Sequence, residues 1–503
     1  MVNGRREYIS ISILFVVNLL NYVDRYTVAG VLTDVQKYYN IDDSSAGLIQ
    51  SVFLAFFIVG SPICGYLGDR FNRKLIILVG VVIWLGAVLG STFVSSDNFW
   101  LFLLFRGLVG IGEASYSNVS PSLISDMFTG PTRSRMYMLF YFAVPVGSGL
   151  GFVVGSNVAS ATGHWQWGVR VTALVGIFVT ILLLLFVHEP VRGGADASTG
   201  AKETNEVAGS YWDDIKALIC IPTFVCCTWG YTALVFVTGT LTWWEPTIIE
   251  YLMAYKNQVT DVGEEDHDHF DKDKDSIGLI FGGITTVAGL IGVSMGTLLA
   301  GWIKAGTGPF RIIQTVRAQP IVSGFGALVA APLLAIVFIF GEKSLLMLWI
   351  LLFVLITFLS LNWGLNVDML MTVIVPSRRS TAFSYFMLIS HLFGDATGPY
   401  LIGIISDQFL KGKPTYVKDG ETVHYPHDQY TSLVKASSIT VALLAISAIL
   451  YFITALCLVR DQRKYNEQMG QSDLELKRAD SPTSLHQLNP SAPPDDISEK
   501  IRL

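Results

Sequence analysis

The ten residues Gly65-Tyr66-Leu67-Gly68-Asp69-Arg70-Phe71-Asn72-Arg73-Lys74 stand between two apolar segments, 46–67 and 75–95. Each segment has the roughly 20 apolar residues that a helix needs to cross a bilayer. The glycines allow a neighbouring helix to come close, the aspartate can accept hydrogen bonds from the N-terminus of a facing helix, and the arginines stay at the membrane surface. We therefore predict a connection between two membrane-spanning helices that latches one conformation through Gly65, Asp69, Arg70 and Arg73.

Apolar windows of spanning length recur along most of the chain, so we expect an all-α membrane protein with twelve transmembrane helices. The windows lie near 8–36, 46–67, 75–95, 99–124, 136–161, 168–188, 214–252, 276–304, 318–340, 344–374, 380–410 and 432–459. The composition agrees, because 51% of the 503 residues are hydrophobic and 15% are charged, whereas a soluble domain carries roughly 25% charged residues.

Charge and cysteine usage exclude several other classes. The net charge of -6 and the lack of a basic stripe give no reason to expect nucleic acid as a partner. The five cysteines all lie in apolar runs and show neither metal-ligand spacing nor a disulfide framework. We therefore expect no metal, no cofactor and no nucleic acid.

The polar stretch 189–213 divides the windows six to six, so we predict an N-terminal half at 1–188, a linker at 189–213 and a C-terminal half at 214–465. The segment 466–503 mixes charged, Ser and Pro residues without periodicity and should be a disordered tail. A short internal repeat, 130–135 and 375–380, supports the two halves.

Basic residues fall on alternate connections, which predicts that these connections and both termini are cytoplasmic. They are Arg5, Arg6, Arg70, Arg73, Lys74, Arg133, Arg135, Arg311, Arg317, Arg378, Arg379, Arg460, Arg463 and Lys464. The acidic stretch 253–275, with His267 and His269, then faces the other side. We interpret it as a solvated loop rather than a metal site, because acidic runs are usually solvated and Lys272 and Lys274 dilute its charge.

Six ionisable residues fall at membrane depth: Asp24, Arg25, Arg106, Glu113, His391 and Asp395. Such groups are costly in lipid, so they should face the bundle interior and meet partners there. Arg106 and Glu113 are seven residues apart, roughly 10 Å along a helix, and are too distant to neutralise each other. Our hypothesis pairs Asp24 with Arg106 and Arg25 with Glu113 across two helices.

His391 and Asp395, four residues apart, should share a hydrogen bond. We predict that the six residues bind substrate and couple protons; the alternative is a set of static structural ion pairs. Gly147, Gly151 and Gly155, at every fourth position, predict a small-residue ridge on which another helix packs or slides.

Two resemblances follow from these motifs. The stretch 65–74 resembles the G-x-x-x-D-R-x-x-R-[RK] loop of the major facilitator superfamily. The stretches 21–25, 43–50, 106–116 and 390–395 resemble the spinster family, and this resemblance extends from Tyr8 to about Arg460. It implies a transporter of lysophospholipid or sphingosine-1-phosphate-like lipid, mostly in late endosomal and lysosomal membranes, and proton-coupled in some members.

The resemblance also implies that Asp24, Arg25, Arg106 and Glu113 form the central charged site of the family. We expect alternating access, with arginines attracting the headgroup and carboxyls carrying the proton. The plasma membrane is the alternative location. Two other functions stay open, transport of small organic anions on the same scaffold and a non-transporting membrane sensor. An enzyme is disfavoured, because we see no nucleophile elbow, zinc signature or P-loop.

Overall fold

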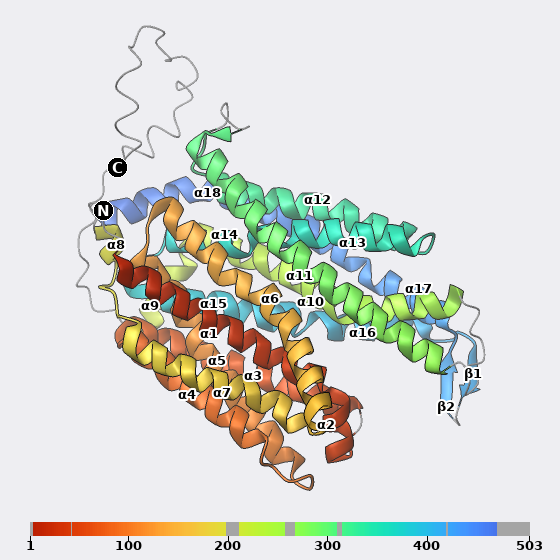
Figure 1. Cartoon of the computed structure of the whole chain (residues 1–503). Helices are drawn as coiled ribbons and strands as arrows, with labels where there is room; N and C mark the ends of the chain where they lie inside the picture. The colour runs from red at the N-terminus through yellow and green to blue at the C-terminus, as the bar shows by residue number, and fades with distance from the viewer. Residues whose placement is uncertain are drawn as a thin grey trace.

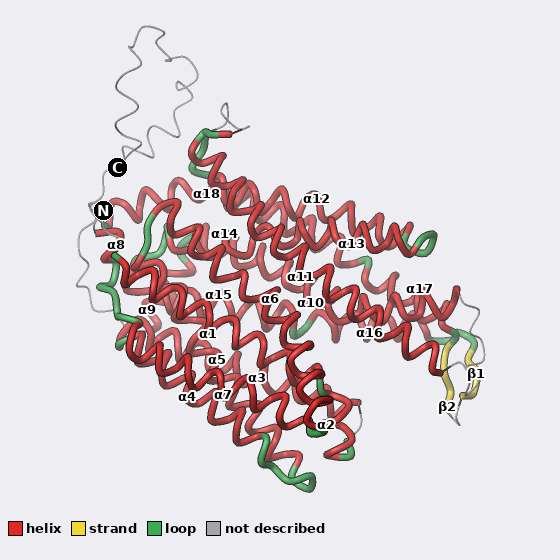
Figure 2. Tube along the Cα trace, in the orientation of Figure 1, coloured by secondary structure: helices red, strands yellow, loops and turns green. Residues whose placement is uncertain are grey.

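The computed structural model describes residues 4–41, 43–197, 211–256, 267–308, 314–418 and 421–469. Within these ranges, twelve helical segments are long and apolar enough to cross a membrane. Nearly all of the described chain is helical, and one short hairpin is the exception (Figure 2). The predicted all-α membrane fold with twelve spans is confirmed, and the hairpin is an addition that the sequence did not indicate.

The first six spans are α1 and α3 to α7, and the short α2 follows α1. Their bounds are α1 Arg5–Gly30, α2 Leu32–Tyr39, α3 Asp43–Arg70, α4 Arg73–Ser91, α5 Phe99–Met127, α6 Gly130–Thr162 and α7 Trp165–Phe186. Two short helices follow, α8 Gly194–Ala197 and α9 Tyr211–Ile219.

The second half contains six spans, several of them broken into two helices. Its elements are α10 Pro222–Lys256, α11 His267–Ala305, α12 Ala318–Phe340, α13 Leu345–Leu359, η2 Ser360–Asn362, α14 Trp363–Met371, η3 Pro376–Arg378, α15 Arg379–Ser390, η4 His391–Asp395, α16 Gly398–Leu410, β1 Thr415–Lys418, β2 Glu421–His424, α17 Pro426–Ser437 and α18 Ile439–Gln468. The strands β1 and β2 pair antiparallel, with Thr415 opposite His424.

Both ends of the described chain lie at one end of the bundle (Figure 1). There α1 begins and α18 ends, beside α8 and α9, whereas β1 and β2 lie at the opposite end. We name these the linker end and the hairpin end. The two halves contact each other mainly through α3 with α15, α5 with α15, and α6 with α11 and α14.

Local chemistry explains how the connection at 71–72 ends one helix and begins the next. The side chain of Asn72 accepts a hydrogen bond from the backbone N–H of Leu75 at 2.9 Å, with extended backbone at φ -64° and ψ 115°. This caps the N-terminus of α4 by satisfying one of its free donors. The cap fixes where α4 starts and thereby holds Arg73 at its first position.

The glycine ridge on α6 packs against α1. A Cβ at Gly151 would lie 2.6 Å from the carbonyl oxygen of Val23, and one at Gly155 would lie 2.6 Å from that of Thr27. Only glycine permits this backbone approach. The predicted packing role of the ridge is confirmed, with a partner that belongs to the same half.

Some predicted boundaries are wrong. The acidic loop was predicted at 253–275, but α10 continues to Lys256 and α11 already begins at His267. Asp268 and Lys272 are four residues apart, a spacing that is compatible with a charged helical turn. Residues 257–266 of the loop lie outside the described chain, as do 198–210 of the linker and 470–503 of the tail.

Candidate functional site

An ion pair between Arg25 on α1 and Glu113 on α5 lies at the centre of the first half. The Arg25 Nη2 donates to Glu113 Oε1, and their side chains are 17% and 4% exposed. The guanidinium also lies over two rings, 4.7 Å from the centroid of Phe53 and 5.4 Å from that of Tyr22. The predicted pairing of Arg25 with Glu113 is confirmed.

The predicted pairing of Asp24 with Arg106 is confirmed only in part: their charges attract each other, but no hydrogen bond or close ion pair joins them within the described chain. Asp24 instead accepts hydrogen bonds from Trp84 Nε1 at 3.1 Å and Thr172 Oγ1 at 2.9 Å, donors on α4 and α7. Arg106, only 2% exposed, has no hydrogen-bond partner for Nε or Nη1 within the described chain. Neutral donors therefore satisfy the aspartate inside its own half, and the arginine keeps two free donors.

His391 and Asp395 meet as predicted, in the second half. The His391 Nδ1 lies 2.9 Å from an Asp395 carboxylate oxygen, and both belong to the π-helical turn η4. The His391 ring stands edge-on to Phe57 of α3, with centroids 5.2 Å apart. Phe57 in turn neighbours Phe53 at 6.4 Å. The charges of His391 and Asp395 also interact with Glu113 and Arg25, so the pairs of the two halves lie close together.

An open apolar groove of about 600 Å³ lies between α6 and α11, and Leu298 and Ile291 in its lining are 48% and 44% exposed. Its lining consists of apolar side chains apart from one serine: Phe142, Leu290, Ile291, Ser294, Met295, Leu298, Leu299 and Trp302. A groove with this apolar lining is compatible with a hydrocarbon chain lying along it. The molecule thus offers a buried guanidinium with rings around it and, separately, a space suited to hydrocarbon.

The predicted latch residues come together where α3 meets α15 at the linker end. Both carboxylate oxygens of Asp69 accept from the first free backbone N–H groups of α15, Ser380 at 2.8 Å and Thr381 at 2.7 Å. Asp69 is 5% exposed. The positive end of the α15 dipole stabilises a carboxylate in this position. Because Asp69 belongs to α3 in the first half and α15 belongs to the second, the contact joins the two halves directly.

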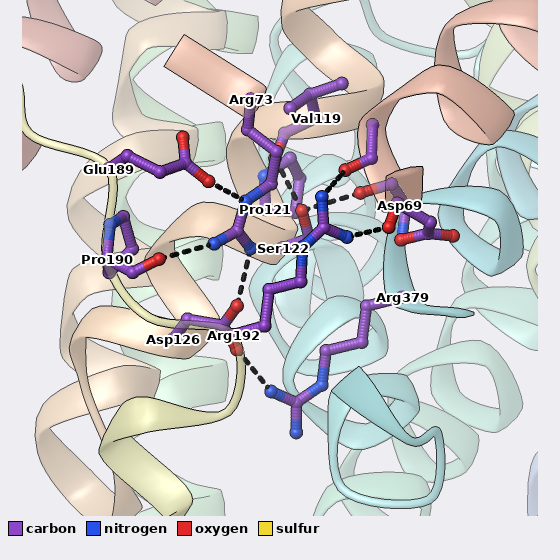
Figure 3. Close-up of polar contacts among 12 residues, drawn as sticks. Asp69, Arg73, Val119, Pro121, Ser122, Asp126, Glu189, Pro190, Arg192 and Arg379 are labelled. Carbon is purple, nitrogen blue, oxygen red and sulfur yellow. Dashed lines mark hydrogen bonds and ion pairs between the residues drawn. The ribbon is translucent and has the colours of Figure 1, made fainter. Parts of the chain in front are cut away.

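Arg73 is fully buried, whereas we expected it at the membrane surface. Figure 3 shows its guanidinium among three acceptors: Asp126 at 2.5 Å, Glu189 at 2.8 Å and the Pro190 carbonyl at 3.0 Å. Asp126 also accepts from Arg379 of α15 at 2.7 Å. The two carboxylates offset the cost of burying the guanidinium, which explains the difference.

Gly65 lets α3 approach α15. A Cβ at this position would lie 2.2 Å from Ser384 Oγ and 2.8 Å from the Ser380 carbonyl oxygen. We expect Gly65→Ala to destabilise this packing by about 1–3 kcal/mol, since the helices must separate. The measurement is the thermal midpoint of the purified protein. Gly86→Ala is the control, because a Cβ there meets nothing within 4 Å; equal midpoints for the two variants would contradict the expectation.

Sequence reasoning missed four functional candidates at the linker end. Asp126 and Asp214 are fully buried carboxylates, and Asp196 and Arg379 are paired with each other at 2.6 Å. The sequence indicates Arg379 only as a basic residue of a connection and as part of the repeat 375–380. The available signal was that these acidic residues lie in connections that are otherwise basic. A carboxylate that is buried there needs an arginine as its partner.

Comparison with known proteins places these features in a family. The Major Facilitator Superfamily profile matches residues 14–399. Protein spinster homolog 1 of Xenopus laevis is 45% identical over 415 residues, covering 82% of this chain and 75% of the relative. The sphingosine-1-phosphate transporter SPNS2 of Danio rerio is 39% identical over 472 residues, covering 94% and 88%.

Solved structures agree on the fold. A bacterial homolog of the human lysosomal transporter Spinster, inward-facing and occupied, superposes with a TM-score of 0.57 at 21% identity, covering 90% of this chain and 97% of that one. The proton:xylose symporter XylE superposes with a TM-score of 0.61 at 15% identity, covering 95% and 99%. The chain therefore belongs to the spinster family of the major facilitator superfamily, whose members are membrane transporters and not enzymes.

Proposed function

We propose that this chain transports lysophospholipid or a sphingosine-1-phosphate-like sphingolipid, linked to protons, by alternating access. The observation that carries the proposal is the buried Arg25–Glu113 pair beside the Phe53 and Tyr22 rings. A guanidinium binds phosphate in a fixed geometry, and rings beside it suit an amphiphile. The relationship to SPNS2, a sphingosine-1-phosphate transporter, supports this substrate class.

In this proposal, the headgroup competes with Glu113 for Arg25. Once the pair is broken, Glu113 is a buried carboxylate without a counterion, and taking up a proton removes most of that cost. The free Nε and Nη1 of Arg106 supply a second set of donors. The open apolar groove between α6 and α11 is the proposed place for the hydrocarbon chain.

We place the linker end in the cytoplasm, with both termini there and the linker at 189–213. Arg5 begins α1 and Arg460 lies in the last turns of α18, and the basic residues of membrane proteins favour the cytoplasmic side. The proposed membrane is late endosomal or lysosomal. Each pH unit across it supplies about 1.4 kcal/mol per proton, so two units support a roughly hundredfold gradient of solute.

The test is uptake by the purified protein in liposomes with an imposed pH gradient. Labelled lysophospholipid, sphingosine-1-phosphate and a small organic anion are offered separately, and the two lipids are then used as competitors against the anion. We expect gradient-dependent uptake of a lipid. Uptake of the anion without competition by lipid would favour the organic-anion alternative, and no flux of any substrate would favour a sensor.

A further inference from the structure

An arginine near the start of the linker, Arg192, forms hydrogen bonds with the end of α3. Arg192 donates to the backbone carbonyls of Gly68 at 3.0 Å, of Phe71 at 2.7 Å and of Asp69. Figure 3 shows its guanidinium beside Asp69, with Glu189 and Pro190 close to Arg73. These carbonyls are the free acceptors at the C-terminus of α3, where a positive charge is favourable. The start of the linker is thereby fixed to the first half.

Asp196 on α8 then binds one arginine from each half. Its Oδ2 accepts from Arg379 Nη2 at 2.6 Å, and its Oδ1 lies 3.8 Å from Arg133 Nη1. Arg379 begins α15 in the second half, and Arg133 lies in the first turn of α6 in the first half. Tyr465 of α18 also donates to Asp196, at 3.1 Å. The side chain of Asp196 is 11% exposed, so the contact is shielded from water.

Asp214 on α9, directly after the linker, repeats this arrangement. Its two oxygens accept from Arg70 of α3 at 2.9 Å and from Arg378 of η3 at 2.7 Å. The Asp214 side chain is fully buried. Beside it, the hydroxyl groups of Tyr211 and Tyr385 lie 2.5 Å apart, so α9 also has a direct hydrogen bond to α15.

Two carboxylates on the short helices between α7 and α10 thus each join an arginine of the first half to an arginine of the second. This clamp shares Arg379 with the direct contact of Asp126. The direct contact of Asp69 uses backbone N–H groups of α15 instead. We propose that Asp196 and Asp214 are positioning residues of the transport cycle, which hold the linker end closed and release it only when both lose an arginine. This inference rests on the proposed alternating access, because opening of the linker end must separate these arginines.

The Asp196 contact should not respond to pH in the range where transport works. Burial acts to raise the pKa of Asp196, but Arg379 and Arg133 outweigh it and leave the pKa below its usual value of 3.8. A lowered pKa means that this stabilising contribution is present above the usual value and is lost only as the pH falls through the lowered one. We expect the acceleration of labelling that Asp196→Asn alone causes in the assay below to be the same at about pH 5 and about pH 8; a tenfold difference between the two would contradict this.

The test is chemical labelling of a buried reporter between the halves. Ser122 is 1% exposed and shares a hydrogen bond with Ser380 at 2.8 Å. Ser122→Cys is placed in a protein whose five native cysteines are replaced, and its reaction with a water-soluble maleimide is timed in nanodiscs. We expect the double variant Asp196→Asn, Asp214→Asn to react about tenfold faster, since the closed state loses two carboxylates that each join arginines of both halves. Arg133 then keeps Asp368, and Arg379 keeps Asp126. Asp213→Asn is the matched control, an exposed acid on the same helix.

Tyr211→Phe is the second variant, in case the double variant does not fold. It removes only one hydrogen bond to Tyr385, and we expect labelling to be about two to three times faster. Unchanged labelling in the folded double variant, or in Tyr211→Phe where the double variant does not fold, would overturn the clamp. Labelling needs no substrate, so faster labelling without lipid uptake would overturn the proposed function and leave the clamp standing.

Discussion

Replacing Glu113 with glutamine is expected to reduce pH-driven accumulation of labelled lysolipid by at least about tenfold. Glutamine cannot take up a proton or neutralise Arg25, so binding of the headgroup is no longer linked to a proton. Exchange of lipid down its own gradient should be reduced far less, because Arg25 and its flanking rings remain. The measurement is accumulation in liposomes with and without an imposed pH gradient.

The control for this variant is another buried glutamate. Glu245 of α10 is 1% exposed, and its Oε2 has no hydrogen-bond partner within the described chain. It therefore matches Glu113 in burial but not in its arginine partner. We expect Glu245→Gln to accumulate lipid as the wild type does. Retained accumulation in Glu113→Gln would show that the proton role assigned to Glu113 is wrong.

The second large effect is expected for Asp126→Asn. The Asp126 carboxylate has no exposed surface and accepts from Arg73 at 2.5 Å and Arg379 at 2.7 Å. Removing its charge leaves two buried guanidinium groups short of a counterion, which should cost about 3–5 kcal/mol of stability. The measurement is the thermal unfolding of the purified protein. Asp97→Asn, at an exposed position, should leave the midpoint unchanged, and a similar small shift for both variants would contradict the role given to Asp126.

The fold could be predicted because the bilayer constrains it so strongly. A span needs about 20 apolar residues, and unpaired backbone groups are not tolerated in hydrocarbon, so hydropathy alone yields twelve helices. The helix ends were less predictable. At α11 the described helix starts at His267, before the apolar window that begins near 276, because a charged turn at the membrane surface adds no hydropathy signal.

The central site was predicted in part. A seven-residue spacing on α5 indicated that Arg106 and Glu113 need partners from another helix, and Arg25 is the partner of Glu113. The same reasoning succeeded only in part for Asp24: its charge interacts with that of Arg106, but its hydrogen bonds come from an indole N–H and a threonine hydroxyl. Neutral donors such as Trp84 and Thr172 are common in membrane helices, so spacing does not indicate which of them will face an acid.

The linker contacts could not be predicted from the sequence. Asp196 and Arg379 are 183 residues apart, and no periodic pattern relates a short polar segment to a distant helix start. The sequence indicates only that such a contact is needed, since an arginine that is buried requires a carboxylate as its partner. Only the packing of the halves determines which acid meets it.

The central claim is that the two halves open alternately at the two ends of the bundle. Spin labels at Arg135 and Glu467 report on the linker end, and labels at Ser96 and Lys343 report on the hairpin end; all four positions are exposed. The distance within each pair of labels is measured by electron paramagnetic resonance at neutral and acidic pH, with and without lysolipid. We predict that one distance lengthens whenever the other shortens. Two distances that stay fixed, or that lengthen together, would contradict alternating access.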